Sequence, residues 1–317
     1  MTSNRTLILF GAGASFGSEP GGATVPPLSA CLYDRLSEFS PDLWGALPSP
    51  YPELFRADFE CAFRQLGDDA PSRLSPDFKA SADYPNRLTG PLLRKMADFF
   101  LEFVPTDDSL YLRLARKVKQ NGWHGVLASL NYDLLLPLAL DRARMTACLS
   151  PWDDNRLRLC LPHGCSALFV EPGRITGSAV LAGLGNRIRG LRVMFERDVH
   201  VARRKLQEEF VPPVMAYFEP GKATVTAPEF LDNQRECLGR AIGAADVAVV
   251  IGVRVREHDR HIWDHLRTTA ARVVYCAPST DEFDKWARGA RPHGRNETLP
   301  GTFEASFEEI CRYAGLG

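Results

Sequence analysis

The sequence predicts an α/β fold: a Rossmann-like, mainly parallel sheet with helices on both faces and helical insertions. Short runs of β-forming apolar residues recur along the 317-residue chain and alternate with amphipathic stretches of helical period. The first run ends in a glycine-rich turn, and the run over 245–252 is almost uniformly apolar, as is typical of a strand buried on both faces. The length fits two ordinary domains or one enlarged domain.

The expected elements begin close to the amino terminus. A strand over 6–10 leads through the glycine-rich turn to a helix on which Leu28, Leu32 and Leu36 share one face. The later elements mix helices and strands, and we expect helices at 91–104, 110–120, 134–144, 234–244 and 259–268, and strands at 125–130, 158–161, 245–252 and 272–276.

We expect a single domain over residues 1–317 that carries two insertions. The stretch at about 40–90 is rich in proline and aromatic residues without strand alternation, which predicts an irregular, mostly helical insertion. The stretch at about 165–232 is polar and interrupted by glycine, and it holds an arginine-rich patch over 187–204. The motifs that follow the strands are then expected at one common edge of the sheet.

Composition excludes several classes of protein. The chain has 38 Lys and Arg against 39 Asp and Glu, a net charge of −1, so direct binding of nucleic acid is not expected. Its eight cysteines are scattered rather than arranged as a dense disulfide framework, which favours a cytoplasmic protein. The apolar runs are far shorter than about 18 residues, so we expect no membrane span.

The first candidate site is the turn Gly11-Ala12-Gly13-Ala14-Ser15 after the first strand. Glycines let the backbone approach a pyrophosphate closely, and unpaired N–H groups at a helix start attract its negative charge. A tight turn from strand to helix can use the same glycines without any ligand. A hydride-transfer enzyme is disfavoured because no acidic residue clearly occupies the expected ribose position about 20 residues further on, and Asp34 lies inside the next helix.

Two further motifs follow predicted strands. Asn131 and Asp133 come after the strand over 125–130, where they fit either a ligand site or the N-cap of the next helix. His163 lies between Pro162 and Gly164 after the strand over 158–161. A neutral imidazole there can act as a general base near pH 7, although a lone histidine also occurs in purely structural roles.

Metal binding is an alternative at two places. Cys160, His163 and Cys165 have mixed-ligand character, but they lack paired C-x-x-C sequences and an obvious fourth ligand. Three histidines at helical spacing can meet on one face, or can equally belong to a solvated helix start: His258, His261 and His265. A metal-dependent hydrolase built on them remains an alternative.

Taken in order, the motifs resemble those of the SIR2 (sirtuin-like) family, specifically the SIR2-like NADase effectors of bacterial antiphage defence. The resemblance covers most of the chain, about residues 6–280. The motifs that carry it are Gly11-Ala12-Gly13-Ala14-Ser15, Asn131-Tyr132-Asp133, His163-Gly164, Val250-Ile251-Gly252 and Asp259-Arg260-His261-Ile262-Trp263.

The resemblance implies NAD⁺ as the substrate of a regulated NAD⁺ glycohydrolase, with no metal. The implied catalytic residues are Asn131, Asp133 and His163. The implied cofactor-binding residues are Gly11, Ala12, Gly13, Ser15, Gly252 and Cys276. Protein deacetylation is not expected, because the chain lacks the G-x-P-D-F-R stretch and the two C-x-x-C zinc knuckles of the deacetylases.

The resemblance also implies partners. An NAD-depleting effector must be held inactive until it is triggered, so we expect a homo-oligomer, a separately encoded activating protein, or both. The implied activators are an ATPase or helicase, a short Argonaute, or a sensor of phage signals. A non-catalytic module that senses NAD or ADP-ribose remains the main alternative.

Overall fold

A computed structural model describes most of the chain, as two compact units. The first unit comprises residues 1–26, 103–163 and 232–317, and the second comprises 27–102 and 164–231. The described residues are 5–21, 24–59, 61–63, 65–66, 86–149, 152, 156–171, 192–208, 212–216, 226–256 and 259–317.

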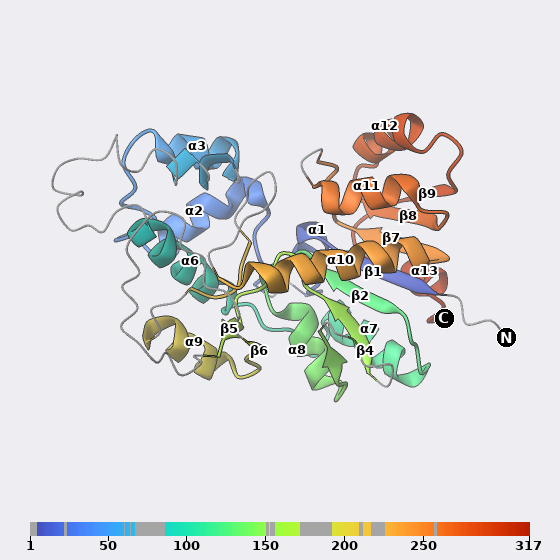
Figure 1. Cartoon of the computed structure of the whole chain (residues 1–317), viewed down its shortest axis with the longest axis horizontal. Coiled ribbons are helices and arrows are strands. Elements are labelled where there is room, and N and C mark those ends of the chain that lie inside the picture. The colour runs from blue at the N-terminus through green and yellow to red at the C-terminus, as the bar shows by residue number, and fades with distance from the viewer. Residues whose placement is uncertain are drawn as a thin grey trace. The chain divides into compact units, whose positions relative to one another are not determined.

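The first unit is built on a seven-stranded sheet in the order β3-β4-β2-β1-β7-β8-β9 (Figure 1). All six neighbouring pairs are parallel. The predicted parallel Rossmann-like sheet is therefore confirmed. The strands are β1 (Thr6–Phe10), β2 (Val126–Ser129), β3 (Ala147–Cys148), β4 (Leu157–Cys160), β7 (Val247–Ile251), β8 (Arg272–Ala277) and β9 (Asn296–Pro300).

Helices cover both faces of this sheet. Successive side chains of each strand point to opposite faces, so a strand that is buried at every position, such as β1, needs cover on both faces. Leu7 and Leu9 of β1 belong to a core cluster that includes residues of α10, α11 and α12. On the other face, the Phe10 ring packs against Tyr111 of α7 and against Phe303. The helices are α1 (Ala12–Phe16), α7 (Leu110–Gln120), α8 (Leu135–Arg142), α10 (Pro228–Ala244, in this unit from residue 232), α11 (Arg260–Thr268), α12 (Asp281–Ala290) and α13 (Phe307–Tyr313).

Most of the predicted elements occur within a few residues of their expected bounds. Two predicted helices are exceptions: the one at 91–104 begins at Asn86 and ends at Phe100, and the one at 234–244 begins at Pro228. Three elements near the carboxyl terminus, α12, β9 and α13, were not predicted. The short helix α1 was also missed, because its five residues directly follow the first strand and include a glycine.

The second unit contains α2 (Ser29–Phe39), α3 (Tyr51–Ala57), α6 (Asn86–Phe100), α9 (Val199–Glu208) and an antiparallel pair of strands, β5 (Leu168–Val170) and β6 (Val193–Phe195). Its core includes a cluster of aromatic rings. The rings of Trp44, Phe55 and Phe59 lie within 5.7 Å of one another, centroid to centroid. Burial of such rings contributes a large hydrophobic free energy, which offsets the entropy cost of ordering the irregular backbone between the helices.

The predicted insertions at about 40–90 and 165–232 fall largely within the two segments of the second unit. Whether the chain is one domain with insertions stays a prediction. Of the predicted arginine-rich patch over 187–204, residues 187–191 lie outside the described part. Arg203 pairs with Asp98 and Glu102, so this arginine holds α9 against α6. Among the described helices, none is both long and apolar enough to cross a membrane.

Candidate functional site

The motifs predicted at strand ends meet at the carboxyl edge of the first unit's sheet. Strand register pairs Phe10 with Ser129 and with Ile251, which places the residues that follow these three strands side by side. The next strand, β4, pairs Ala128 with Cys160, so the chain toward His163 leaves the sheet at the same edge. Ligands of open α/β sheets bind at this edge.

Three glycines form a close backbone contact at this edge. Gly252 has a φ of +62°, and a Cβ atom added to it would lie 2.3 Å from the backbone nitrogen of Ala14. A Cβ on Gly11 would lie 2.6 Å from the carbonyl oxygen of Gly252, and one on Gly13 would lie 2.9 Å from its Cα. The turn before α1 therefore packs directly against the end of β7, which only glycine allows.

The backbone N–H groups of this turn have acceptors within the protein. Gly11 donates to the carbonyl of Ile251, Gly13 to that of Gly252, and Ala14 to that of Gly11, at 2.9 to 3.0 Å. The expectation of unpaired N–H groups is therefore wrong for Gly13 and Ala14, because the β7 end and the turn itself use them. Ala12 is exposed on the outer side of the turn. A phosphate-binding role of this turn stays a prediction.

Asn131 is buried and fixes the turn from the neighbouring strand end. Its side-chain nitrogen donates to the carbonyl of Gly11 at 3.0 Å and to the hydroxyl of Ser15 at 2.8 Å. Both hydrogens of the amide are thereby used inside the protein. The N-cap alternative is not what the structure has for Asn131, since α8 begins at Leu135 with Leu134 at its N-cap. Asn131 instead links two strand ends.

Asp133 and Tyr111 complete this buried polar group. The Asp133 carboxylate accepts the backbone N–H of Leu135 at 3.0 Å, and the Tyr111 hydroxyl lies 3.1 Å from that of Ser15. Burial raises the pKa of Asp133 to about 6, against the opposing effect of the Leu135 hydrogen bond. Burial also raises the pKa of the Tyr111 hydroxyl well above its ordinary value, and the negative charge of Asp133 adds to that shift.

We expect Asp133→Asn to gain stability over the natural protein as pH rises. The pKa of Asp133 is about 6 when folded against 3.8 as its ordinary value, so the folded state binds more protons in this range. The natural protein therefore loses stability between pH 4 and 6, and the loss is constant at higher pH. The free energy of unfolding of the variant, relative to the natural protein, should rise by about 2 to 3 kcal/mol from pH 4 to pH 7.

Denaturant unfolding of both proteins at each pH measures this difference. The amide oxygen of asparagine still accepts from Leu135, so the fold is retained. Asp108→Asn, at an exposed position of the same unit, is the matched control and should show no comparable rise. A difference that stays flat across the pH range would contradict the effect of burial on Asp133.

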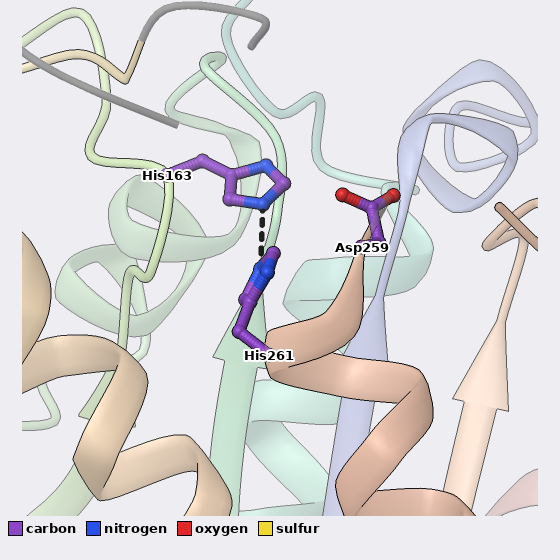
Figure 2. Close-up of side chains that lie close together, drawn as sticks. All are labelled: His163, Asp259 and His261. Carbon is purple, nitrogen blue, oxygen red and sulfur yellow. Dashed lines mark hydrogen bonds between the residues drawn. The ribbon is translucent and has the colours of Figure 1, made fainter. Parts of the chain in front are cut away.

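His163 meets a second histidine and an aspartate (Figure 2). Its Nε2 lies 2.9 Å from Nε2 of His261, which is in the first turn of α11, and its Nδ1 lies 3.1 Å from the carbonyl oxygen of Leu130. A carbonyl only accepts, so Nδ1 carries a proton and Nε2 is the basic nitrogen when the ring is neutral. Asp259, just before α11, completes a group whose ligand atoms lie within 4.8 Å of one another.

This group differs from both metal-binding alternatives considered from the sequence. Cys160 lies in the apolar core, where burial raises the pKa of its thiol, and it is not part of the group. His265 packs against Gly239 of α10, one turn along the helix from His261. His258 lies outside the described residues. Of the three predicted histidines, the described structure therefore places only His261 beside His163.

No family model and no curated protein matches the chain. Several solved structures of sirtuins are similar to it at low identity. A SIR2 homologue in complex with NAD is 15% identical, with 99% of this chain and 91% of that chain covered and a TM-score of 0.45. A SIR2 protein bound to an inhibitor, 2′-O-acetyl-ADP-ribose and a deacetylated peptide is 14% identical, with 99% and 95% covered and a TM-score of 0.45.

A further sirtuin, described for its substrate affinity, is 14% identical, with 98% of this chain and 94% of that chain covered and a TM-score of 0.44. The strand order and the parallel pairings described above are those of a Rossmann-like α/β fold.

Cys276 lies at the same edge of the sheet, but its side chain is buried. The thiol lies 3.7 Å from the carbonyl oxygen of Gly301 and 3.9 Å from that of Thr302, and burial raises its pKa. Its backbone carbonyl accepts the N–H of Gly252 at 2.9 Å. The residue therefore braces the glycine contact, and its predicted role at an adenine ring stays a prediction.

Two residues of this region were missed by the sequence reasoning. Tyr111 lies on the apolar face of α7, and a buried tyrosine hydroxyl needs a polar partner, which is the signal that could have indicated it. Glu19 is buried, and its carboxylate accepts the N–H and the hydroxyl of Thr106. Glu19 thereby ties the segment after α1 to the start of the α7 region.

Proposed function

We propose that the first unit is an NAD⁺ glycohydrolase that cleaves NAD⁺ to nicotinamide and ADP-ribose. The observation that carries the chemistry is the fixed orientation of His163 at the carboxyl edge of the sheet. Its Nδ1 is held by the carbonyl of Leu130, the residue before Asn131. A general base and a buried amide thus stand at adjacent strand ends. The identity of the substrate comes from the motif resemblance alone.

The proposed reaction breaks the bond between the ribose C1′ and the nicotinamide nitrogen. The bonding electron pair stays with nicotinamide, which leaves as a neutral ring, and a water oxygen forms the new bond to C1′. The proton released by that water goes to the His163–His261 pair, whose Nε2 atoms lie 2.9 Å apart. The products are nicotinamide, ADP-ribose and one proton.

Asn131 and Asp133 have supporting roles in this proposal. The side-chain oxygen of Asn131 orients a ribose hydroxyl or the attacking water. Asp133 is buried next to the same turn, and its negative charge above pH 6 favours the positive charge that develops on the ribose. The turn over 11–15, with Gly252, holds the dinucleotide, and Cys276 lies toward the adenine end.

We further propose, from the resemblance, that the enzyme is a regulated cytoplasmic effector of antiphage defence that depletes NAD⁺. The trigger would be homo-oligomerisation or a separately encoded ATPase, helicase, short Argonaute or phage-signal sensor. The near-zero net charge of −1 fits a small-molecule substrate rather than nucleic acid.

The test incubates the purified full chain with NAD⁺ over a range of protein concentrations and follows nicotinamide and ADP-ribose by chromatography. In parallel, calorimetry measures NAD⁺ binding, and the NAD⁺ content of cells that express the chain is measured with and without phage infection. Release of nicotinamide in equal amounts with ADP-ribose, in either setting, supports the proposal. Binding of NAD⁺ without cleavage in both settings would instead favour the sensing module, and the absence of both would contradict an NAD-related site.

A further inference from the structure

We propose that His163, His261 and Asp259 bind a Zn²⁺ ion, and that bound Zn²⁺ blocks the cleavage proposed above. The first half stands on the geometry of the three side chains. The second half rests on the proposed function, because it concerns the same His163 nitrogen. The sequence expectation of a reaction without metal is retained, since here the ion inhibits.

The nitrogen atoms of the two histidines already converge. The Nε2 atoms of His163 and His261 lie 2.9 Å apart, on loop and helix segments 98 residues distant in the chain. A tetrahedral zinc ion at about 2.0 Å from each nitrogen requires a separation of about 3.3 Å, so the pair need open by only about 0.4 Å. The Asp259 carboxylate lies nearby, and one ligand atom from each of the three residues lies within 4.8 Å of the other two (Figure 2).

The surroundings of His163 prepare it as a ligand. Histidine binds a metal through an unprotonated nitrogen, and the other ring nitrogen usually donates to a carbonyl or a carboxylate. In His163 the carbonyl of Leu130 accepts from Nδ1 at 3.1 Å, which leaves the Nε2 lone pair directed at His261. This tautomer and ring orientation of His163 are those a metal site requires. His261 donates its Nε2–H to His163 in this arrangement, so metal binding requires His261 to carry its proton on Nδ1 instead.

Asp259 supplies the negative charge. It is 6% exposed and precedes α11, yet its side chain does not cap that helix. Two neutral imidazoles and one carboxylate lower the charge of a divalent zinc ion to +1, which makes its burial less unfavourable. Imidazole and carboxylate ligands suit zinc, and three protein ligands leave the fourth position to water.

Zinc at this place opposes the proposed cleavage for two reasons. Coordination uses the Nε2 lone pair of His163, so that nitrogen no longer accepts a proton from water. If the proposed function holds, the cation would also lie near the ribose carbon on which positive charge develops, and like charges repel. Zinc would therefore act as an inhibitor whose removal restores the base.

The first experiment measures Zn²⁺ binding to the full chain by competition with a chromophoric chelator. We expect one site per chain, with affinity reduced at least about 100-fold in His261→Ala and in His163→Ala. His265→Ala changes an exposed histidine on the same helix and is the matched control, which should bind as the natural protein does. Equal Zn²⁺ binding by the natural protein and His261→Ala, or no binding by either, would overturn the site.

The second experiment compares NAD⁺ cleavage with a chelator present and with Zn²⁺ present, as a ratio for each protein. We expect at least a tenfold loss with Zn²⁺ in the natural protein and a ratio near one in Asp259→Asn, which keeps both imidazoles but lacks the charged ligand. Activation by Zn²⁺, or equal inhibition of both proteins, would overturn inhibition through this site. Absence of cleavage under every condition would reject the proposed function, while the binding experiment would still decide the metal site.

Discussion

His163→Ala should slow the cleavage of NAD⁺ at least about 100-fold, since general-base catalysis commonly contributes 10²- to 10⁴-fold. The change removes Nε2, the nitrogen that the Leu130 carbonyl leaves as the proton acceptor. Nicotinamide release by active protein, measured under conditions in which the natural chain turns over, gives the rate. Calorimetry should show NAD⁺ binding reduced much less than the rate.

The matched control is His293→Ala, an exposed histidine in the same unit, which should leave the rate unchanged. Thermal unfolding of each variant shows that the fold is retained. His163 is a better test than Asn131, because replacing Asn131 also breaks its bonds to Gly11 and Ser15 and so displaces the turn. Cleavage by His163→Ala at the natural rate would remove this histidine from the mechanism.

Gly252→Ala should lower the free energy of unfolding by about 3 kcal/mol or more. The residue has a φ of +62°, a conformation that costs an alanine about 1 kcal/mol. The added Cβ would also lie 2.3 Å from the backbone nitrogen of Ala14. A contact with backbone cannot be relieved by rotating a side chain, so α1 or the end of β7 must shift. Denaturant unfolding followed by circular dichroism measures the loss.

Gly289→Ala provides the comparison. Gly289 lies in α12 and an added Cβ would have no neighbour within 4 Å. Alanine in an unobstructed helix position is favoured over glycine by about 0.5 to 1 kcal/mol, so this variant should be slightly more stable than the natural protein. Similar shifts in the two variants would show that the Gly252 contact is not tight.

The sheet could be predicted because its signal is local. Buried parallel strands consist of short apolar runs, as in β7 (Val247–Ile251), and the carboxyl ends of such strands must lie at one edge whatever their order. This is why Gly11, Asn131, His163 and Gly252 could be expected together. The order of the strands could not be read from the chain, because β1 pairs with β2 and β7 across long intervening segments.

The pairing of His163 with His261 could not be predicted. It depends on where α11 packs against the sheet and on the side-chain rotamers, and neither leaves a pattern in the sequence. The spacing of the histidines instead suggested that His261 meets His265, but the first-turn residue faces the sheet edge while His265 packs on Gly239. Helical spacing alone did not determine which neighbour each histidine meets.

The orientation of Asn131 restricts the chemistry of any ligand beside it. With both amide hydrogens bonded to Gly11 and Ser15, the remaining hydrogen-bonding atom of the side chain is its oxygen, which can only accept. Such an atom attracts hydroxyl, water or amide hydrogens and repels phosphate or carboxylate oxygens. A ligand that reaches this oxygen is therefore favoured if it offers a hydroxyl or amide hydrogen there, and disfavoured if it offers an anionic oxygen.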